Sequence, residues 1–344
     1  MADIKYYKHG MGVGDNFYHI DSNILINIGK FYFDAQCGSD NVLTEQIRQF
    51  IMQCRKNGYL SYEHALLEIC YDSGTNSINS DVMNKFMMAV DTLFVNCPDE
   101  EVLSHKPQII PFCKERTTVD FNSFFDCKLP KLAFSDAIDS LSLFYLMYLY
   151  FIKIYHLAEC QIKPMEKVKQ LYNYMIKEIN CFMAHEFLLG QMVFIGGGKE
   201  KSIADGILKF GKIKSGKPAI RLLTNALFDI MIYRQMTMMV DIAMKEKIPL
   251  NCTFVTQDKD LQNYIEMNSE FKTVINSDKI SNTFSSEFIP DEKYLEEWND
   301  FYSNTMMVNA KQRFMEYQLS NKITVDKEKI LKEIYYYEDI VFKR

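Results

Sequence analysis

The sequence has 344 residues, of which 48% are hydrophobic and 14% aromatic, so it can bury a sizeable core and does not resemble a disordered chain. Its formal net charge of −6 argues against a protein that coats nucleic acid non-specifically, because such proteins neutralise many phosphates with Lys and Arg. The nine cysteines include no CxxC pair, and the N-terminus has no apolar signal segment. We therefore expect reduced thiols in a cytoplasmic protein.

The first 75 residues predict one strand followed by helices. NFYHID (16–21) is a short β-rich run, and a helix is expected over 23–33. Apolar residues at three-to-four spacing predict a second helix over 44–57, with Gly58 as its C-cap. A third helix is expected within LSYEHALLEICYDSG (60–74), closed by Gly74.

Residues 76–198 predict a mostly helical subdomain, because apolar residues recur at helical spacing through most of this stretch. The segment 141–158, LSLFYLMYLYFIKIYHLA, is long and apolar enough to raise the question of a membrane span. Its four tyrosines, Lys153 and His156 favour a buried helix, so we expect no membrane association.

Residues 199–280 return to an α/β pattern, and residues 281–344 predict a helical C-terminal extension. GGGKEKS (196–202) is expected to be a loop, followed by a long helix over 219–246 and a strand in IPLNCTFVTQD (248–258). A short helix over 261–267 and the strand KTVIN (272–276) come next. Strands that alternate with helices indicate a parallel sheet, whose ligands bind at the carboxyl ends of the strands.

Two of the predicted strands end in aspartates. Phe17–Ile20 leads into Asp21, and Thr253–Val255 leads into Thr256, Asp258 and Asp260. An acid at the end of an apolar strand is costly unless a cation or hydrogen bonds compensate its charge. Carboxylates are the ligands that Mg²⁺ prefers, so the aspartates at these two strand ends are candidate metal ligands.

The runs HIDSNILINI (19–28) and FVTQDKDL (254–261) resemble the opening and closing motifs of PIN-domain nucleases. The resemblance covers about 1–75 and 200–275 and implies an α/β fold with a PIN-like parallel sheet flanked by helices. The insertion over 76–198 would interrupt this domain, and the extension over 281–344 would follow it. The family also implies an acidic cluster that binds Mg²⁺ or Mn²⁺ and hydrolyses phosphodiester bonds, usually in RNA.

The second acid of the family lies on a helix, where Glu68 is the better candidate and Glu63 the rival. Glu63 lies in the first turn of this helix, where an acid is expected simply to complement the helix dipole. The third should lie beside the carboxyl end of the neighbouring strand, before the last motif. A strand of about 17–20 Å matches about 11–13 residues of antiparallel helix, which places Asp241 at the wrong end and favours Asp229. Asp136 and Asp139 form a competing pair that is more typical of a helix cap.

We therefore expect the metal to be held by Asp21, Glu68, Asp229 and Asp258, with Asp260 as a further ligand and with Asn23, Asn225 and Thr256 in supporting positions. A local excess of basic residues between 199 and 221 is a candidate nucleic-acid surface, and a solvated loop is the equal alternative. Its members are Lys199, Lys201, Lys209, Lys212, Lys214, Lys217 and Arg221.

The sequence predicts a metal-dependent endoribonuclease, and the resemblance implies a toxin-like, antiphage-defence or RNA-processing role. The helical insertion would shape the substrate channel or bind a protein partner or inhibitor, and a homo-oligomer is compatible with it. One alternative keeps the acidic site but takes DNA, as flap nucleases do. The other is a PIN-like scaffold without catalysis, in which the helices form an interaction module. A separate alternative for the acids is that they are ordinary caps and turn residues.

Overall fold

The computed structural model describes residues 3–10, 15–34, 41–72, 77–104, 140–212, 217–267, 270–276, 279–285, 288–320 and 326–342. Within these ranges the chain is a mixed α/β protein that forms two compact units. The first unit comprises the described residues of Met1–Phe124, Phe228–Gln262 and Thr273–Asn282. The second unit comprises Phe125–Leu227, Asn263–Lys272 and Thr283–Arg344, with the same restriction.

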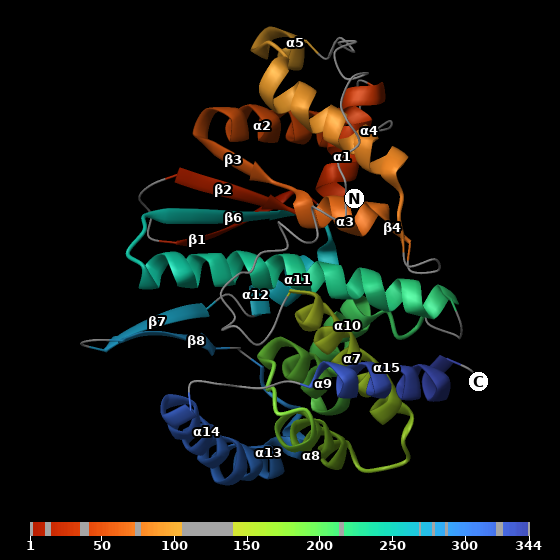
Figure 1. The fold of residues 1–344 in the computed structure, drawn as a ribbon, viewed down its shortest axis with the longest axis vertical. Helices are drawn as coiled ribbons and strands as arrows, with labels where there is room; N and C mark the ends of the chain where they lie inside the picture. Colours follow the sequence, from red (N-terminus) through yellow and green to blue (C-terminus); the bar gives the residue numbers. More distant parts are fainter. Residues whose placement is uncertain are drawn as a thin grey trace. The chain divides into compact units, whose positions relative to one another are not determined.

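The first unit is built on a four-stranded sheet (Figure 1). Its strands, in the order β1-β6-β2-β3, are β1 (Lys5–Gly10), β6 (Leu250–Thr256), β2 (Asp15–Ile20) and β3 (Gly58–Ser61). β2 is parallel to both β6 and β3, with Ile20 opposite Val255 and His19 opposite Ser61. β1 runs antiparallel to β6, so the expectation of an all-parallel sheet is wrong at this edge.

Helices cover both faces of this sheet (Figure 1). The helices and short strands that follow β2 are α1 (Ser22–Asp34), α2 (Asn41–Asn57), α3 (Glu63–Cys70), β4 (Tyr71–Asp72), β5 (Ser77–Ile78), α4 (Ser80–Asp91), η1 (Thr92–Asn96) and α5 (Asp99–Leu103). On one face Tyr18 of β2 packs against Phe50 of α2. On the other, Phe254 of β6 packs against Tyr233 of α11 (Lys217–Lys245).

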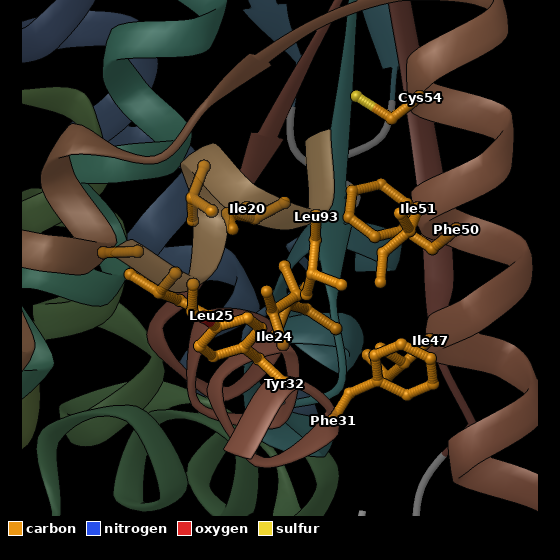
Figure 2. Close-up of a cluster of buried hydrophobic side chains, with 14 of the residues drawn as sticks. Ile20, Ile24, Leu25, Phe31, Tyr32, Ile47, Phe50, Ile51, Cys54 and Leu93 are labelled. Atoms are coloured by element: carbon orange, nitrogen blue, oxygen red, sulfur yellow. The ribbon is translucent and has the colours of Figure 1, made fainter. Parts of the chain in front are cut away.

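The core under α1 and α2 is made of side chains from several elements, as Figure 2 shows for Ile20, Leu25, Phe50 and Leu93. These four are at most 1% exposed. Met83, Ala89, Val90 and Leu93, from α4 and η1, belong to the same cluster. The first helices of the segment 76–198 therefore pack into the core of the first unit.

Three local expectations are wrong. Gly58 does not cap α2 but opens β3, where a side chain would meet the main-chain oxygen of Asn16 at 2.0 Å. The helix of residues 60–74 ends at Cys70 because Tyr71 is extended and enters β4. GGGKEKS is not only a loop, since α10 (Gly198–Leu208) begins at its third glycine.

The second unit is largely helical. Its helices are α7 (Ser140–Glu159), α8 (Pro164–Asn173), η3 (Tyr174–Glu178), α9 (Ala184–Ile195), α10, η4 (Glu292–Tyr294), α13 (Leu295–Phe301), η5 (Tyr302–Met306), α14 (Met307–Ser320) and α15 (Lys327–Phe342). α12 (Lys259–Met267), β7 (Glu270–Asn276) and β8 (Lys279–Ser285) have residues in both units, and β7 and β8 form a separate two-stranded sheet.

Polar bonds hold α15 against its neighbours in this unit. The hydroxyl of Tyr148 donates to Glu338 at 2.8 Å, and the Lys153 ammonium lies 4.5 Å from the ring centroids of both Tyr174 and Tyr337. Tyr148 and Lys153 belong to the apolar segment 141–158, so this helix has polar partners inside the protein. In the described part of the chain, no helix combines the length and apolarity of a membrane crossing.

Candidate metal centre

Asp21 follows β2 directly and is only 1% exposed. Its main-chain N–H donates to the carbonyl of Val255 on β6 at 3.1 Å, which continues the pairing of the two parallel strands. Its Oδ1 accepts the N–H of Ile24 at 2.9 Å and thereby caps α1. Its Oδ2 accepts the hydroxyl of Thr256 from the end of β6.

Asp258 follows β6 in the same way. Its Oδ1 accepts the N–H groups of Asp260 at 2.8 Å and Leu261 at 3.0 Å, so it caps α12. Its own N–H donates to the Thr256 hydroxyl oxygen at 3.0 Å. Thr256, which is fully buried, therefore links the two aspartates through one oxygen atom.

The electrostatics of Asp21 are those of a buried carboxylate beside a second one. The pKa of Asp21 is raised from 3.8 to about 6, mainly by burial and in smaller part by the negative charge of Asp258. Hydrogen bonds from Thr256, Ile24 and Gln257 act in the opposite direction. A divalent cation between Asp21 and Asp258 would relieve both the burial cost and the repulsion. The pair therefore fits a hard cation.

The remaining predicted ligands lie on other elements of the structure. Glu68 is partly buried on α3, Asp229 is 6% exposed on α11, and Asp260 lies in the first turn of α12. Among the described side chains, no three His, Cys, Asp or Glu residues lie close enough together to hold a metal ion. Thr256 brings Asp21 and Asp258 together. The roles of Glu68, Asp229 and Asp260 as ligands stay predictions.

The rival acids are placed as follows. Glu63 accepts the hydroxyl of Ser61 at 3.1 Å in the first turn of α3, as the dipole argument expects. Asp241 lies on α11, but its side chain is outside the described set, and Asp136 and Asp139 lie outside the described residues. The supporting candidates Asn23, on α1, and Asn225, on α11, are both partly buried.

The sequence did not single out two histidines near this strand end. Burial lowers the pKa of His19 to about 4, and burial together with His19 lowers that of His64 to about 3. The Nε2 atoms of both rings are buried without a hydrogen-bond partner within the described structure. The strand register places His19 opposite Ser61, just before α3, and His19 is near enough to His64 to lower its pKa. The signal was present, since His19 is polar inside an apolar strand.

The basic segment belongs to the second unit, and four of its side chains are exposed: Lys199, Lys201, Lys212 and Arg221. Lys209 is partly buried, and its backbone is left-handed at the end of α10. Lys217 begins α11, but its side chain is not described, and Lys214 lies outside the described residues. The four exposed cations are accessible to a polyanion.

Comparison with known proteins gives no relative. No family model matches the chain, and no curated protein or solved structure is significantly similar to it.

Proposed function

We propose that this chain is a divalent-metal-dependent nuclease with a PIN-like core and that RNA is its substrate. The observation that carries the proposal is the pair Asp21 and Asp258, linked by Thr256 at the carboxyl ends of adjacent parallel strands. Ligands of α/β sheets bind at these ends. The path from β2 through α1 and α2 to β3, with a later return to β6 beside β2, supports a PIN-like arrangement.

Asp21 and Asp258 would hold Mg²⁺ or Mn²⁺, and Glu68, Asp229 and Asp260 are proposed as further ligands. When bound, the ion would polarise the scissile phosphate and lower the pKa of a water molecule that attacks it. The protein's own contribution is orientation. Thr256 fixes Oδ2 of Asp21, and the α12 N–H groups fix Oδ1 of Asp258, whose Oδ2 makes no hydrogen bond among the described residues.

RNA is proposed as substrate because the PIN-like motifs imply it and because Lys199, Lys201, Lys212 and Arg221 are exposed in an otherwise acidic chain. Cations of this kind bind the phosphate backbone without reading the bases. They would supply affinity, whereas the carboxylates would supply the chemistry.

A non-catalytic scaffold is the second candidate, and one observation favours it. Asp21 and Asp258 both cap helices, and a cap needs no metal. In that case the acids serve only the local fold.

The test is cleavage of labelled RNA and DNA strands of one sequence by the full-length protein in Mn²⁺, Mg²⁺ or EDTA. Asp258→Asn is the decisive variant, because asparagine caps a helix as well as aspartate does but is a poor ligand. Asp81→Asn, an exposed acid in the first turn of α4, is the matched control. We expect RNA cleavage that needs metal, is lost in Asp258→Asn and persists in Asp81→Asn.

Cleavage of DNA alone would keep the site and change the substrate. Equal cleavage by both variants would show that Asp258 is not a ligand. If the wild-type protein neither cuts a strand nor binds Mn²⁺, the scaffold is the better description.

A further inference from the structure

Asn27 is a polar residue on the buried, mostly apolar face of α1. It is 6% exposed, and its buried neighbours on the helix include Ile24, Leu25, Ile28 and Phe31. A buried amide is costly unless it is hydrogen-bonded. Its Nδ2 donates to Oε1 of Gln257 at 2.8 Å, across 230 residues of sequence.

In the sequence, Gln257 lies between Thr256 and Asp258, the residues that form the candidate metal centre with Asp21. The bond to Asn27 therefore ties the helix that Asp21 caps to the loop that carries the second carboxylate. A second amide holds the end of β6, just before this loop, since Gln262 of α12 donates to the main-chain oxygen of Thr256 at 3.2 Å.

The two carboxylates repel each other when no cation is bound, because Asp21 and Asp258 carry like charges and are linked through one oxygen atom of Thr256. Thr256 also contacts both aspartates, but it belongs to β6, the strand that leads into this loop. The Asn27–Gln257 bond is a side-chain link between α1 and this loop that does not use a carboxylate. It can oppose the repulsion without competing with the metal for a ligand atom.

We infer that Asn27 and Gln257 are positioning residues that set the separation of Asp21 and Asp258 and thereby the affinity for the metal ion. This inference rests on the proposed function. Amides suit the task, since they are neutral and their hydrogen bond does not change with pH. Partners that orient ligands from outside the coordination shell typically affect metal affinity by about 10- to 100-fold.

The test measures Mn²⁺ affinity by titration calorimetry on the full-length protein, together with the midpoint of urea unfolding without metal. The variants are Asn27→Ala, Gln257→Ala and the exchange N27Q/Q257N, which keeps two amides and the total side-chain length. Gln53→Ala is the matched control, since Gln53 donates to Tyr18 at 3.3 Å in the same unit and this bond involves neither carboxylate.

Both single variants should bind Mn²⁺ about 10-fold more weakly than the wild type, and the exchange should restore much of this loss. Gln53→Ala should lower the urea midpoint but keep the affinity. If Asn27→Ala fails to fold, Gln257→Ala decides, because Gln257 is only partly buried. RNA cleavage at limiting Mn²⁺ should fall in parallel and recover when Mn²⁺ saturates the site.

Wild-type affinity in a folded Gln257→Ala variant would overturn the inference and leave the nuclease intact. A loss of affinity in Gln53→Ala equal to that in Gln257→Ala would also overturn it, because stability alone would then set the affinity. Failure of the proposed function is visible elsewhere, as a wild-type protein that binds no Mn²⁺ and cuts no strand.

Discussion

Replacing Asp21 with asparagine should stabilise the metal-free protein at pH 8. The pKa of this carboxyl rises from its ordinary value of 3.8 to about 6, mainly because it is buried. One pKa unit corresponds to about 1.4 kcal/mol, so the charged form of Asp21 costs the folded state about 3 kcal/mol. Asparagine removes this cost and still caps α1 through its Oδ1.

The gain will be smaller than this full amount. The Thr256 hydroxyl now donates to Asp21 Oδ2 and accepts the N–H of Asp258, whereas an asparagine amide at this place can only donate to it. The hydroxyl proton then loses its partner, at about 1 kcal/mol. We expect the free energy of unfolding of Asp21→Asn to exceed that of the wild type by about 2 kcal/mol at pH 8.

The dependence on pH follows from the same values. Because the folded-state pKa of Asp21 is raised, the cost is present in full above about pH 6. It fades as the pH falls toward 3.8, where the unfolded chain also takes up the proton. The advantage of Asp21→Asn should therefore shrink between pH 7 and pH 4.

The assay is urea unfolding in EDTA, followed by far-ultraviolet circular dichroism. Trp298, the sole tryptophan, lies in the second unit and would not report on the sheet. Mn²⁺ should raise the midpoint of the wild type and leave that of Asp21→Asn unchanged. A variant less stable than the wild type at pH 8, or equally stabilised at pH 8 and pH 4, would refute the reasoning.

Two other predictions concern stability. Gly58→Ala should lower the free energy of unfolding by about 1–3 kcal/mol, because the Cβ of the alanine would meet a main-chain oxygen of β2. Gly198→Ala has open space around its Cβ and should leave the free energy of unfolding unchanged in the same urea titration. Stability should also fall from pH 6.5 toward pH 4, since the unfolded chain protonates His19 and His64 while the folded one, with pKa values of about 4 and 3, does not. Asp21 acts in the opposite direction, but two imidazoles outweigh one carboxyl; a flat stability curve over this range would show that the rings are not buried as neutral groups.

The elements that the sequence predicted well are those with a strong local pattern. β2, α1, α2, α11 and β6 were all expected from the local sequence, and the structure confirms them with ends that differ by a few residues. The pairing of Asp21 with Asp258 was predictable for a related reason. Both acids follow apolar strands, and parallel strands bring their carboxyl ends to one edge.

The sequence could not predict elements that depend on partners far along the chain. β1 alternates between partly buried and exposed residues and gains its place only by pairing with β6, some 240 residues away. β3 has four residues and begins at Gly58, which locally is just as typical of a helix cap. Asn27 looked like any polar residue of a helix, because its partner Gln257 is equally remote.

Asp21 can be a helix cap or a metal ligand, and the two roles differ in the free energy that a buried charge costs the folded state. A cap needs one acceptor oxygen, which serine, threonine or asparagine supplies without a charge. At position 21 the chain instead carries an aspartate that is 1% exposed, with a pKa raised to about 6. Burial is the larger cause of this rise, and the charge of Asp258 contributes to it. A cation would offset both effects, so the cost of Asp21 in the metal-free state is what supports a metal ligand over a cap.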